Sequence, residues 1–373
     1  MSKRILAFMV ALMSFMMFIP VYADGPTPEK VRSFQDKFMA ELGKAMSVLE
    51  QNPTIAYQVR TEGDVAVVGD LHGDYQVLTK IIEAVEPRLK DRSISAVVFL
   101  GDYMDRGNNS ALTLYLLLRF YNEHPGRVVI LRGNHETMSV NPQNWPDDPY
   151  FKDLNPEIFR KFFNALPIMV FINEHTLAVH GGIPVESLWD AFAEGFLRDE
   201  KPSDRMEYLE PGADLFSDAI HSILWSDVTE QSDMVGKPNV RAPGDTRVSY
   251  YDVNSWTRFV KFMQEKTHGM EYNKFFANLC WLIRGHQPFY IEGDCIKGIA
   301  CYRIGNIITF HCALENQFLG EDLYKAGAKV AIVPKEAGPP IEWLTIKFDR
   351  DGSDQTILYS GDGSGLPIGA RRI

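Results

Sequence analysis

Apolar runs followed closely by glycine recur three times in the first third of the chain. They consist mainly of β-branched and aliphatic residues and cover positions 65–68, 96–100 and 128–131. Short runs of this composition, bounded by glycine, are typical of buried strands. Between them, residues 75–89 and 110–121 have apolar positions at helical spacing. This β-α-β-α-β series predicts parallel strands connected by helical crossovers, and hence an α/β fold.

Each of the three runs leads into a loop of metal-binding residue types. The loops read GDLHGD (69–74), GDYMDRG (101–107) and RGNHE (132–136). Ligands of an open α/β sheet bind at the carboxyl ends of its strands, so we expect the loops to meet at one edge. Carboxylate, imidazole and amide groups suit hard or borderline divalent ions. Asp102 in the middle loop is the candidate bridge between two ions, because a carboxylate has two oxygens.

Two later strands are predicted to end in similar loops. Residues 168–172 and 176–179 form a predicted hairpin that ends in HGG at His180, and residues 281–283 form a buried strand that ends in RGHQ, which contains His286. A lone histidine after a strand is more often structural, but beside two glycines and after three metal-binding loops His180 is expected to be a ligand.

Further segments have weaker patterns. Residues 341–348 are predicted to pair with 356–359 across an acidic turn that lacks the ligand Glu and the flanking helices of an EF-hand, so we expect a plain hairpin turn. Residues 190–215 are charged and turn-rich, which predicts a surface insertion.

The N-terminal 60 residues divide into two segments. Lys3 and Arg4 precede an apolar run up to Ile19, and a small-residue exit ends at Ala23. This predicts a secretory signal peptide over residues 1–23, because the run is shorter than the about 20 apolar residues of a membrane span. An uncleaved anchor is the alternative. Residues 24–60 are expected to form a helical extension and residues 61–373 the catalytic domain.

The composition is that of a folded, acidic protein. The 373 residues are 45% hydrophobic and 23% charged, with a net charge of −11, which excludes a disordered chain. An acidic chain without a basic stripe is a poor nucleic-acid binder, so a phosphate substrate would be attracted by metal ions and a few arginines. None of the four cysteines is in a CxxC spacing; Cys295 and Cys301 flank a predicted hairpin and could pair, or all four, with Cys280 and Cys312, could be reduced.

The motifs GDLHG, GDYMDRG and RGNHE resemble the three signature blocks of the PPP family of metallophosphatases, in the family's order. This is the family of eukaryotic-type protein serine/threonine phosphatases, within the calcineurin-like phosphoesterase fold. HGG and RGHQ resemble its later metal-ligand blocks, and LWSD (224–227) resembles a segment that supports the site by packing. The resemblance implies a calcineurin-like metallophosphoesterase fold, an α/β architecture with a central β-sandwich of mixed sheets flanked by helices.

The resemblance also implies a role for each candidate residue. Two divalent ions, Mn, Fe or Zn, would be bound by six side chains: Asp70, His72, Asp102, Asn134, His180 and His286. Hydroxide bound to the ions would attack phosphorus, His135 would protonate the leaving group, and Asp105 would orient His135. Arg106 and Arg247 would bind the phosphoryl oxygens. Arg241 is the alternative to Arg247, whose surroundings lack the glycine of the family pattern.

The substrate-facing segment departs from the family. HCALEN (311–316) stands where the eukaryotic enzymes have Ser-Ala-Pro-Asn-Tyr, so serine/threonine specificity is not implied, and the chain is similar to the branch of bacterial exported phosphatases, some of which act on phosphotyrosine. We expect a secreted or periplasmic phosphatase of phosphotyrosine and/or phosphoserine/threonine in proteins, with no nucleic-acid partner and no membrane span after signal cleavage; the oligomeric state is left open. The alternatives are a dinucleoside tetraphosphate hydrolase, which shares the first three blocks, and a metal-bound pseudoenzyme that binds phosphoproteins.

Overall fold

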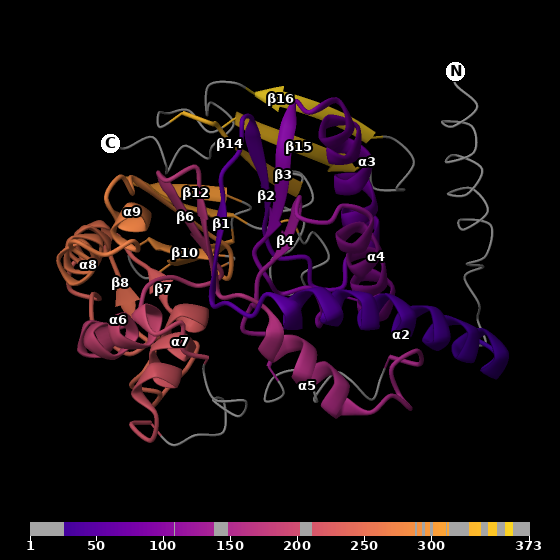
Figure 1. Cartoon of the computed structure of the whole chain (residues 1–373), viewed down its shortest axis with the longest axis horizontal. Helices are drawn as coiled ribbons and strands as arrows, with labels where there is room; N and C mark the ends of the chain where they lie inside the picture. Colours follow the sequence, from indigo (N-terminus) through magenta and orange to yellow (C-terminus); the bar gives the residue numbers. More distant parts are fainter. Residues whose placement is uncertain are drawn as a thin grey trace.

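Two six-stranded sheets, whose facing sides share one hydrophobic core, form the centre of the computed structural model (Figure 1). The structure describes residues 26–107, 109–137, 148–201, 211–287, 289–292, 295–298, 301–310, 312, 328–336, 342–348 and 355–360. The predicted signal peptide therefore lies outside the described residues. The mixed α/β architecture with two packed sheets confirms the predicted fold class.

Sheet I carries the first three predicted loops and has the order β16-β15-β14-β2-β3-β4. Its strands are β2 (Asp64–Val68), β3 (Ile94–Phe99), β4 (Val128–Ile130), β14 (Ala328–Val333), β15 (Glu342–Phe348) and β16 (Gln355–Ser360). Strands β2, β3 and β4 are parallel, as predicted, with β3 in the middle. Strands β14, β15 and β16 extend the sheet in antiparallel pairing beyond β2. The predicted pairing of β15 with β16 is confirmed, and the turn between them lies outside the described residues.

Sheet II carries the two later loops and has the order β1-β5-β6-β9-β13-β12. Its strands are β1 (Ala56–Val59), β5 (Met169–Ile172), β6 (Thr176–Val179), β9 (Trp281–Arg284), β12 (Cys301–Ile304) and β13 (Ile307–Phe310). The predicted β5–β6 hairpin is present, and β6 and β9 lie side by side in parallel. The ends of β6 and β9 are therefore neighbours, although about a hundred residues separate them in the chain.

Two small sheets complete the strand set. They pair β7 (Asp227–Val228) with β8 (Tyr250–Tyr251), and β10 (Phe289–Glu292) with β11 (Cys295–Gly298). Because β11 pairs with β10 whereas β12 pairs with β13, the predicted hairpin between Cys295 and Cys301 is wrong. The side chains of these two cysteines are outside the described part. Cys280 and Cys312 are free thiols.

Helices α3 (Tyr75–Asp91) and α4 (Ser110–Glu123) cover the outer face of sheet I. Figure 1 shows α2 (Pro28–Gln51) crossing the end of α4, with α5 (Pro156–Ala165) on the other side of α2. Helix α2 is amphipathic, since Phe38, Leu42, Ala45 and Leu49 recur at helical spacing on its buried side. None of the helices in the described ranges is both long and apolar enough to cross a membrane.

A second core lies on the outer face of sheet II. Along β5, Val170 belongs to the core between the sheets and Phe171 to the outer core, as the alternation of side chains in a strand requires. The elements packed there are η3 (Glu186–Leu188), α6 (Trp189–Leu197), α7 (Leu215–Trp225), α8 (Val253–Lys266) and α9 (Asn273–Phe276). The prediction of a surface insertion over residues 190–215 is wrong at its start, because α6 buries Phe192 and Phe196 in this core.

Candidate metal centre

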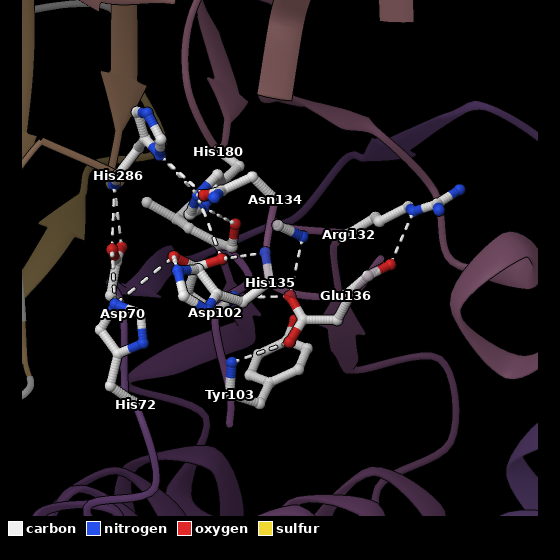
Figure 2. Close-up of polar contacts among 12 residues, drawn as sticks. Asp70, His72, Asp102, Tyr103, Arg132, Asn134, His135, Glu136, His180 and His286 are labelled. Carbon is white, nitrogen blue, oxygen red and sulfur yellow. Dashed lines mark hydrogen bonds and ion pairs between the residues drawn. The ribbon is translucent and has the colours of Figure 1, made fainter. Parts of the chain in front are cut away.

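The predicted ligand loops meet where the two sheets face each other. Asp70 and His72 follow β2, Asp102 follows β3, Asn134 follows β4, His180 follows β6 and His286 follows β9. All six side chains are buried, and Figure 2 shows Asp102 at the centre of the group. Side chains from five strand ends and two sheets thus converge on one point, as the rule for the carboxyl ends of strands predicts.

Lone pairs converge on the sheet II side of this point. The Nδ1 of His180 donates to the carbonyl oxygen of Leu100 (3.0 Å), which leaves its Nε2 as an acceptor. This Nε2 lies 2.8 Å from Oδ1 of Asn134 and 3.2 Å from Nδ1 of His286. It also lies 3.3 Å from a carboxylate oxygen of Asp102. Several acceptors at such short separations need a proton or a cation between them, and this mixed N/O set suits a divalent ion.

The sheet I side is built in the same way. The Nδ1 of His72 donates to the carbonyl oxygen of Met104 (3.1 Å), so its Nε2 is the atom that can bind an ion. That Nε2 lies 3.4 Å from Asp102 and 3.8 Å from Asp70. The two oxygens of Asp102 therefore face opposite sides of the centre, which is the arrangement expected of a bridge.

Geometry alone groups the candidate ligands into two sets. In one set, donor atoms of His72, Asp102 and His135 lie within 4.8 Å of one another, and in the other those of Asp102, His180 and His286 do. Asp102 is common to both sets. The residues present thus fit two divalent ions that share one carboxylate.

The electrostatics of the centre favour ligation. Burial, and then the charge of Arg106, lowers the pKa of His72 well below its ordinary value, and burial followed by Arg241 does the same for His286. Neutral imidazoles are the form that binds metal. The pKa of His180 is instead raised: burial acts to lower it, but the charge of Asp102 outweighs burial, so positive charge is favoured between these two side chains. Burial acts to raise the pKa of Asp102, but the imidazoles of His180 and His135 outweigh it and hold that pKa well below its usual range. The bridge candidate is therefore ionised at neutral pH.

His135, Asp105 and Arg106 form a hydrogen-bonded chain beside the ligands. The Nδ1 of His135 donates to Oδ2 of Asp105 (2.8 Å). The Arg106 guanidinium donates to Nε2 of His135 and to Nε2 of His72, both at 3.0 Å. The carboxylate thus fixes the His135 ring so that its Nε2 is turned toward the ligands. This contact between Asp105 and His135 is the one expected for an oriented proton donor.

The structure distinguishes the two candidate phosphate-binding arginines. Asp245 holds the Arg247 guanidinium through two hydrogen bonds (2.8 and 2.9 Å), and Asp218 adds a contact at 3.4 Å. Arg241 instead donates to the carbonyl oxygen of His286 (3.1 Å) and to Asp227 (3.4 Å). Arg241 thus lies beside a ligand loop, whereas Asp245 already occupies one hydrogen-bonding edge of the Arg247 guanidinium. These contacts favour the alternative, Arg241, and the choice between the two arginines stays a prediction.

Glu136 is a site residue to which the sequence analysis gave no role. Its carboxylate accepts hydrogen bonds from the backbone N–H groups of Asp102 (2.7 Å), Tyr103 (2.9 Å) and Gly133 (2.9 Å). It therefore ties the second loop to the third, as Figure 2 shows. The sequence feature that could have identified Glu136 is the position of an acidic residue directly after two functional residues in a buried loop. Close approach of the same loops also explains their glycines, because a Cβ at Gly101 would collide with the backbone of Gly133.

Replacing Glu136 with Gln is expected to lower the free energy of unfolding by about 2 kcal/mol, because the amide NH₂ would face a backbone donor that then loses its acceptor. Denaturant-induced unfolding measures this change. Glu123→Gln, at an exposed pair with Arg119, is the matched control and should have little effect. Burial, and then the charge of Asp102, raises the pKa of Glu136 to about 8, so the full loss is expected above pH 8, where the carboxylate is ionised, and a smaller loss at pH 7. Wild-type stability of Glu136→Gln above pH 8 would contradict the role of the ionised carboxylate in holding the two loops together.

Several of these residues have left-handed backbone conformations that favour glycine. The φ values are +45° at His72, +56° at Asp102, +69° at Asp105, +68° at Arg106 and +66° at His286. Such conformations cost free energy in residues with a Cβ, and they persist where the surrounding structure enforces them. Leu71 and His72 both donate backbone hydrogen bonds to the carbonyl oxygen of Asp102, which holds the first two loops together.

The segment HCALEN lies mostly outside the described residues. Within it Cys312 is described, and its N–H donates to the carbonyl oxygen of Asp70 (3.1 Å) while its thiol donates to that of Lys329 (3.0 Å). Cys312 thus packs behind a ligand loop. Its neighbours, on which the expectation about substrate specificity depended, are not described.

Comparison with known proteins agrees with this geometry. Residues 63–290 match the calcineurin-like phosphoesterase family. A probable serine/threonine-protein phosphatase of Encephalitozoon cuniculi is 36% identical over 150 residues, which are 37% of this chain and 32% of that protein, so the match spans about a third of that relative.

Among solved structures, a protein serine/threonine phosphatase of Saccharomyces cerevisiae with similarity to human phosphatase PP5 aligns with a TM-score of 0.60 at 20% identity, over 99% of this chain and 98% of that one. A cold-active protein-tyrosine phosphatase of a Shewanella species aligns with a TM-score of 0.45 at 14% identity, over 82% of each chain. The family match covers more than half of the chain and includes every loop of the metal centre. The chain therefore belongs to the calcineurin-like phosphoesterase family.

Proposed function

We propose that the protein is a phosphoprotein phosphatase that uses two divalent metal ions. The observation that carries the proposal is the convergence of donor atoms from both sheets on the two sides of Asp102. Asp70 and His72 would hold one ion, Asp102 would bridge, and Asn134, His180 and His286 would hold the other. Such ions, when bound, supply Lewis acidity and an acidified water. Mn, Fe and Zn all suit this mixture of ligands.

The surrounding residues supply the rest of the chemistry. In the structure Nε2 of His135 accepts a hydrogen bond from Arg106, so to act as the acid His135 would first take up a proton at Nε2 while Arg106 turns to the phosphoryl oxygens; it would then give that proton to the leaving alkoxide or phenoxide, with Asp105 holding the ring in place. Arg106 and Arg241 would bind the phosphoryl oxygens, because guanidinium groups match the negative charge that spreads over them in the transition state. In support, these two arginines are close enough that Arg241 lowers the pKa of Arg106, in addition to the effect of burial, which is larger.

The proposal extends to substrate and location. The 36% identical relative is a probable serine/threonine-protein phosphatase, which supports a phosphorylated protein as substrate. We infer that phosphotyrosine and phosphoserine/threonine are both candidates, since the family's tyrosine-containing segment is replaced by HCALEN. The basic and apolar pattern of residues 1–23 supports export, in which case a periplasmic or secreted enzyme would obtain its ions, manganese among them, outside the cytosol.

The purified protein loaded with Mn²⁺ is expected to release phosphate from phosphopeptides, to lose this activity on chelation and to regain it when Mn²⁺ is restored. Parallel assays with phosphotyrosine, phosphoserine and phosphothreonine peptides of one sequence would define the specificity. Turnover of dinucleoside tetraphosphate alone would replace the proposal with the hydrolase alternative. Binding of phosphopeptide without turnover would indicate a pseudoenzyme, and activity that survives full chelation would exclude the metal mechanism.

A further inference from the structure

Arg241 lies in a closed loop that projects between β7 and β8. The N–H of Asn239 donates to the carbonyl oxygen of Val248 (3.2 Å), and Pro238 bridges to Ser249, so the two ends of the loop are joined. We call residues 239–248 the arginine loop. One end is anchored to β7 beside the metal centre, because Nδ2 of Asn239 donates to Oδ2 of Asp227 (2.8 Å), and the other oxygen of Asp227 lies 3.8 Å from Nε2 of His286. The rest of the loop has little regular structure, so other contacts must define its position.

A cluster of four charged or titratable side chains fastens the far side of this loop to α7. Asp245 of the loop accepts hydrogen bonds from Nε2 of His221 (3.0 Å) and from the guanidinium of Arg247. Arg247 also contacts Asp218, one turn before His221 on α7 (3.4 Å). We call Asp218, His221, Asp245 and Arg247 the clasp. Its members from α7 are 2% and 8% exposed, Arg247 is 9% exposed and the Asp245 side chain is 20% exposed, so these charge-assisted bonds are partly shielded from water.

The clasp is more strongly paired than a surface ion pair. Burial raises the pKa of Asp245, but hydrogen bonds from His221 and Arg247 outweigh it and hold that pKa well below its usual range. The carboxylate is thus stabilised in its ionised form by partners on α7 and within the loop. A network of this kind fixes geometry as well as contributing stability, because the Arg247 guanidinium presents its donors in a rigid plane.

Helix α7 in turn has a fixed place relative to the metal ligands. The His221 ring stacks on Trp225, with centroids 6.0 Å apart and planes at 26°. Trp225 makes an edge contact with the ring of His286, with centroids 5.8 Å apart. His221 is therefore connected by packed rings to the same residue whose carbonyl oxygen binds Arg241. Fastening the loop to α7 consequently sets the position of Arg241 relative to His286.

We propose that the clasp is a positioning device for phosphate recognition, which holds the arginine loop so that the Arg241 guanidinium faces the phosphoryl group at the metal centre. The inference rests on the proposed function, since Arg241 binds phosphate only if the centre is a phosphatase site. In this proposal the clasp residues act on phosphate binding indirectly and do not contact the substrate. Their effect on phosphate binding must therefore pass through Arg241, and this makes the proposal separable from a purely structural role.

The test is a double-mutant cycle of Asp245→Asn and Arg241→Ala in the full chain loaded with Mn²⁺. We expect Asp245→Asn to raise both the KM for p-nitrophenyl phosphate and the inhibition constant of inorganic phosphate about fivefold, which is within the range of energetic coupling between contacting elements. In the Arg241→Ala background, Asp245→Asn should leave both constants unchanged. Metal stoichiometry should be that of wild type in all variants. Asp233→Asn, an exposed carboxylate in the same β7–β8 segment, is the matched control.

Each other outcome counts against the inference. Equal increases of KM in both backgrounds, or a lowered melting temperature with unchanged KM and inhibition constant, would reduce the clasp to a structural role and overturn the proposal. If Asp245→Asn does not fold, Arg247→Gln replaces it in the same cycle with the same expectations. Failure of Arg241→Ala itself to weaken phosphate binding would refute the proposed role of Arg241 and the clasp with it. An Arg241 effect without an Asp245 effect would refute the clasp alone.

Discussion

Asp102→Asn is expected to remove both metal ions and to lower kcat/KM about a thousandfold or more, which corresponds to the several kcal/mol that metal ions contribute to such transition states. One oxygen of Asp102 faces His180 at 3.3 Å and the other faces His72 at 3.4 Å. An asparagine has one oxygen and one NH₂ group, so it can contact an ion on one side of the centre only. On the other side its N–H donors would face the lone pair of a histidine nitrogen. Metal analysis after dialysis, with kinetics on p-nitrophenyl phosphate, measures both effects.

Asp105→Asn provides the matched control for this variant. It is the same chemical change three residues along the same loop, at a carboxylate that contacts His135 and belongs to neither metal-binding set. It should retain both ions while losing activity through a misplaced His135. Full metal stoichiometry in Asp102→Asn would show that Asp102 is not the bridge and would contradict the two-ion proposal.

His135→Asn is expected to lower kcat about a hundredfold to ten-thousandfold on phosphoserine peptides while leaving the metal content unchanged. The Nε2 of His135 is turned toward the ligands and its Nδ1 is held by Asp105, so the ring is placed to protonate the leaving group. The loss should be much smaller on p-nitrophenyl phosphate, because its leaving group is stable as an anion and needs no proton. Paired kcat measurements on the two substrates test this.

Equal losses on the two substrates would contradict the role of His135 as general acid. They would instead indicate that the His135 imidazole binds metal. This alternative is supported by the position of His135 in the donor set that contains His72 and Asp102. Metal analysis of His135→Asn separates these cases, because the replacement of a metal ligand would cause the loss of an ion. A residue that merely stabilised its turn would change neither stoichiometry nor substrate dependence.

The strand ends of the centre could be predicted from sequence because two local signals coincide there. A β-branched run followed by glycine marks the end of a buried strand, and the side chains after it are brought together by the rule for parallel sheets. The structure places Asp70, Asp102 and Asn134 after adjacent parallel strands in this way. The convergence of these loops could therefore be predicted without any knowledge of tertiary contacts, whereas the assignment of six ligands to them rests on the resemblance to the PPP family.

The arginine loop and α7 could not be predicted by the same reasoning. The loop has no strand or helix period, so only its contacts with Asp227 and α7 distinguish Arg241 from Arg247. In α7 the buried positions include Ser217, Asp218, His221 and Ser222, and these polar residues conceal the helical spacing of the apolar ones. The fold of this part of the molecule could not be predicted from sequence, because its buried polar residues have partners that are distant in the chain.

The division of the ligand set between two sheets has a consequence for biosynthesis. Asp70 and His286 are 216 positions apart, yet the carboxylate of one accepts the backbone N–H of the other. As the polypeptide leaves the ribosome, the early members of the proposed ligand set must wait until His286 has been translated. A nascent or truncated product that stops before β9 would therefore lack His286, and the proposed centre could not assemble.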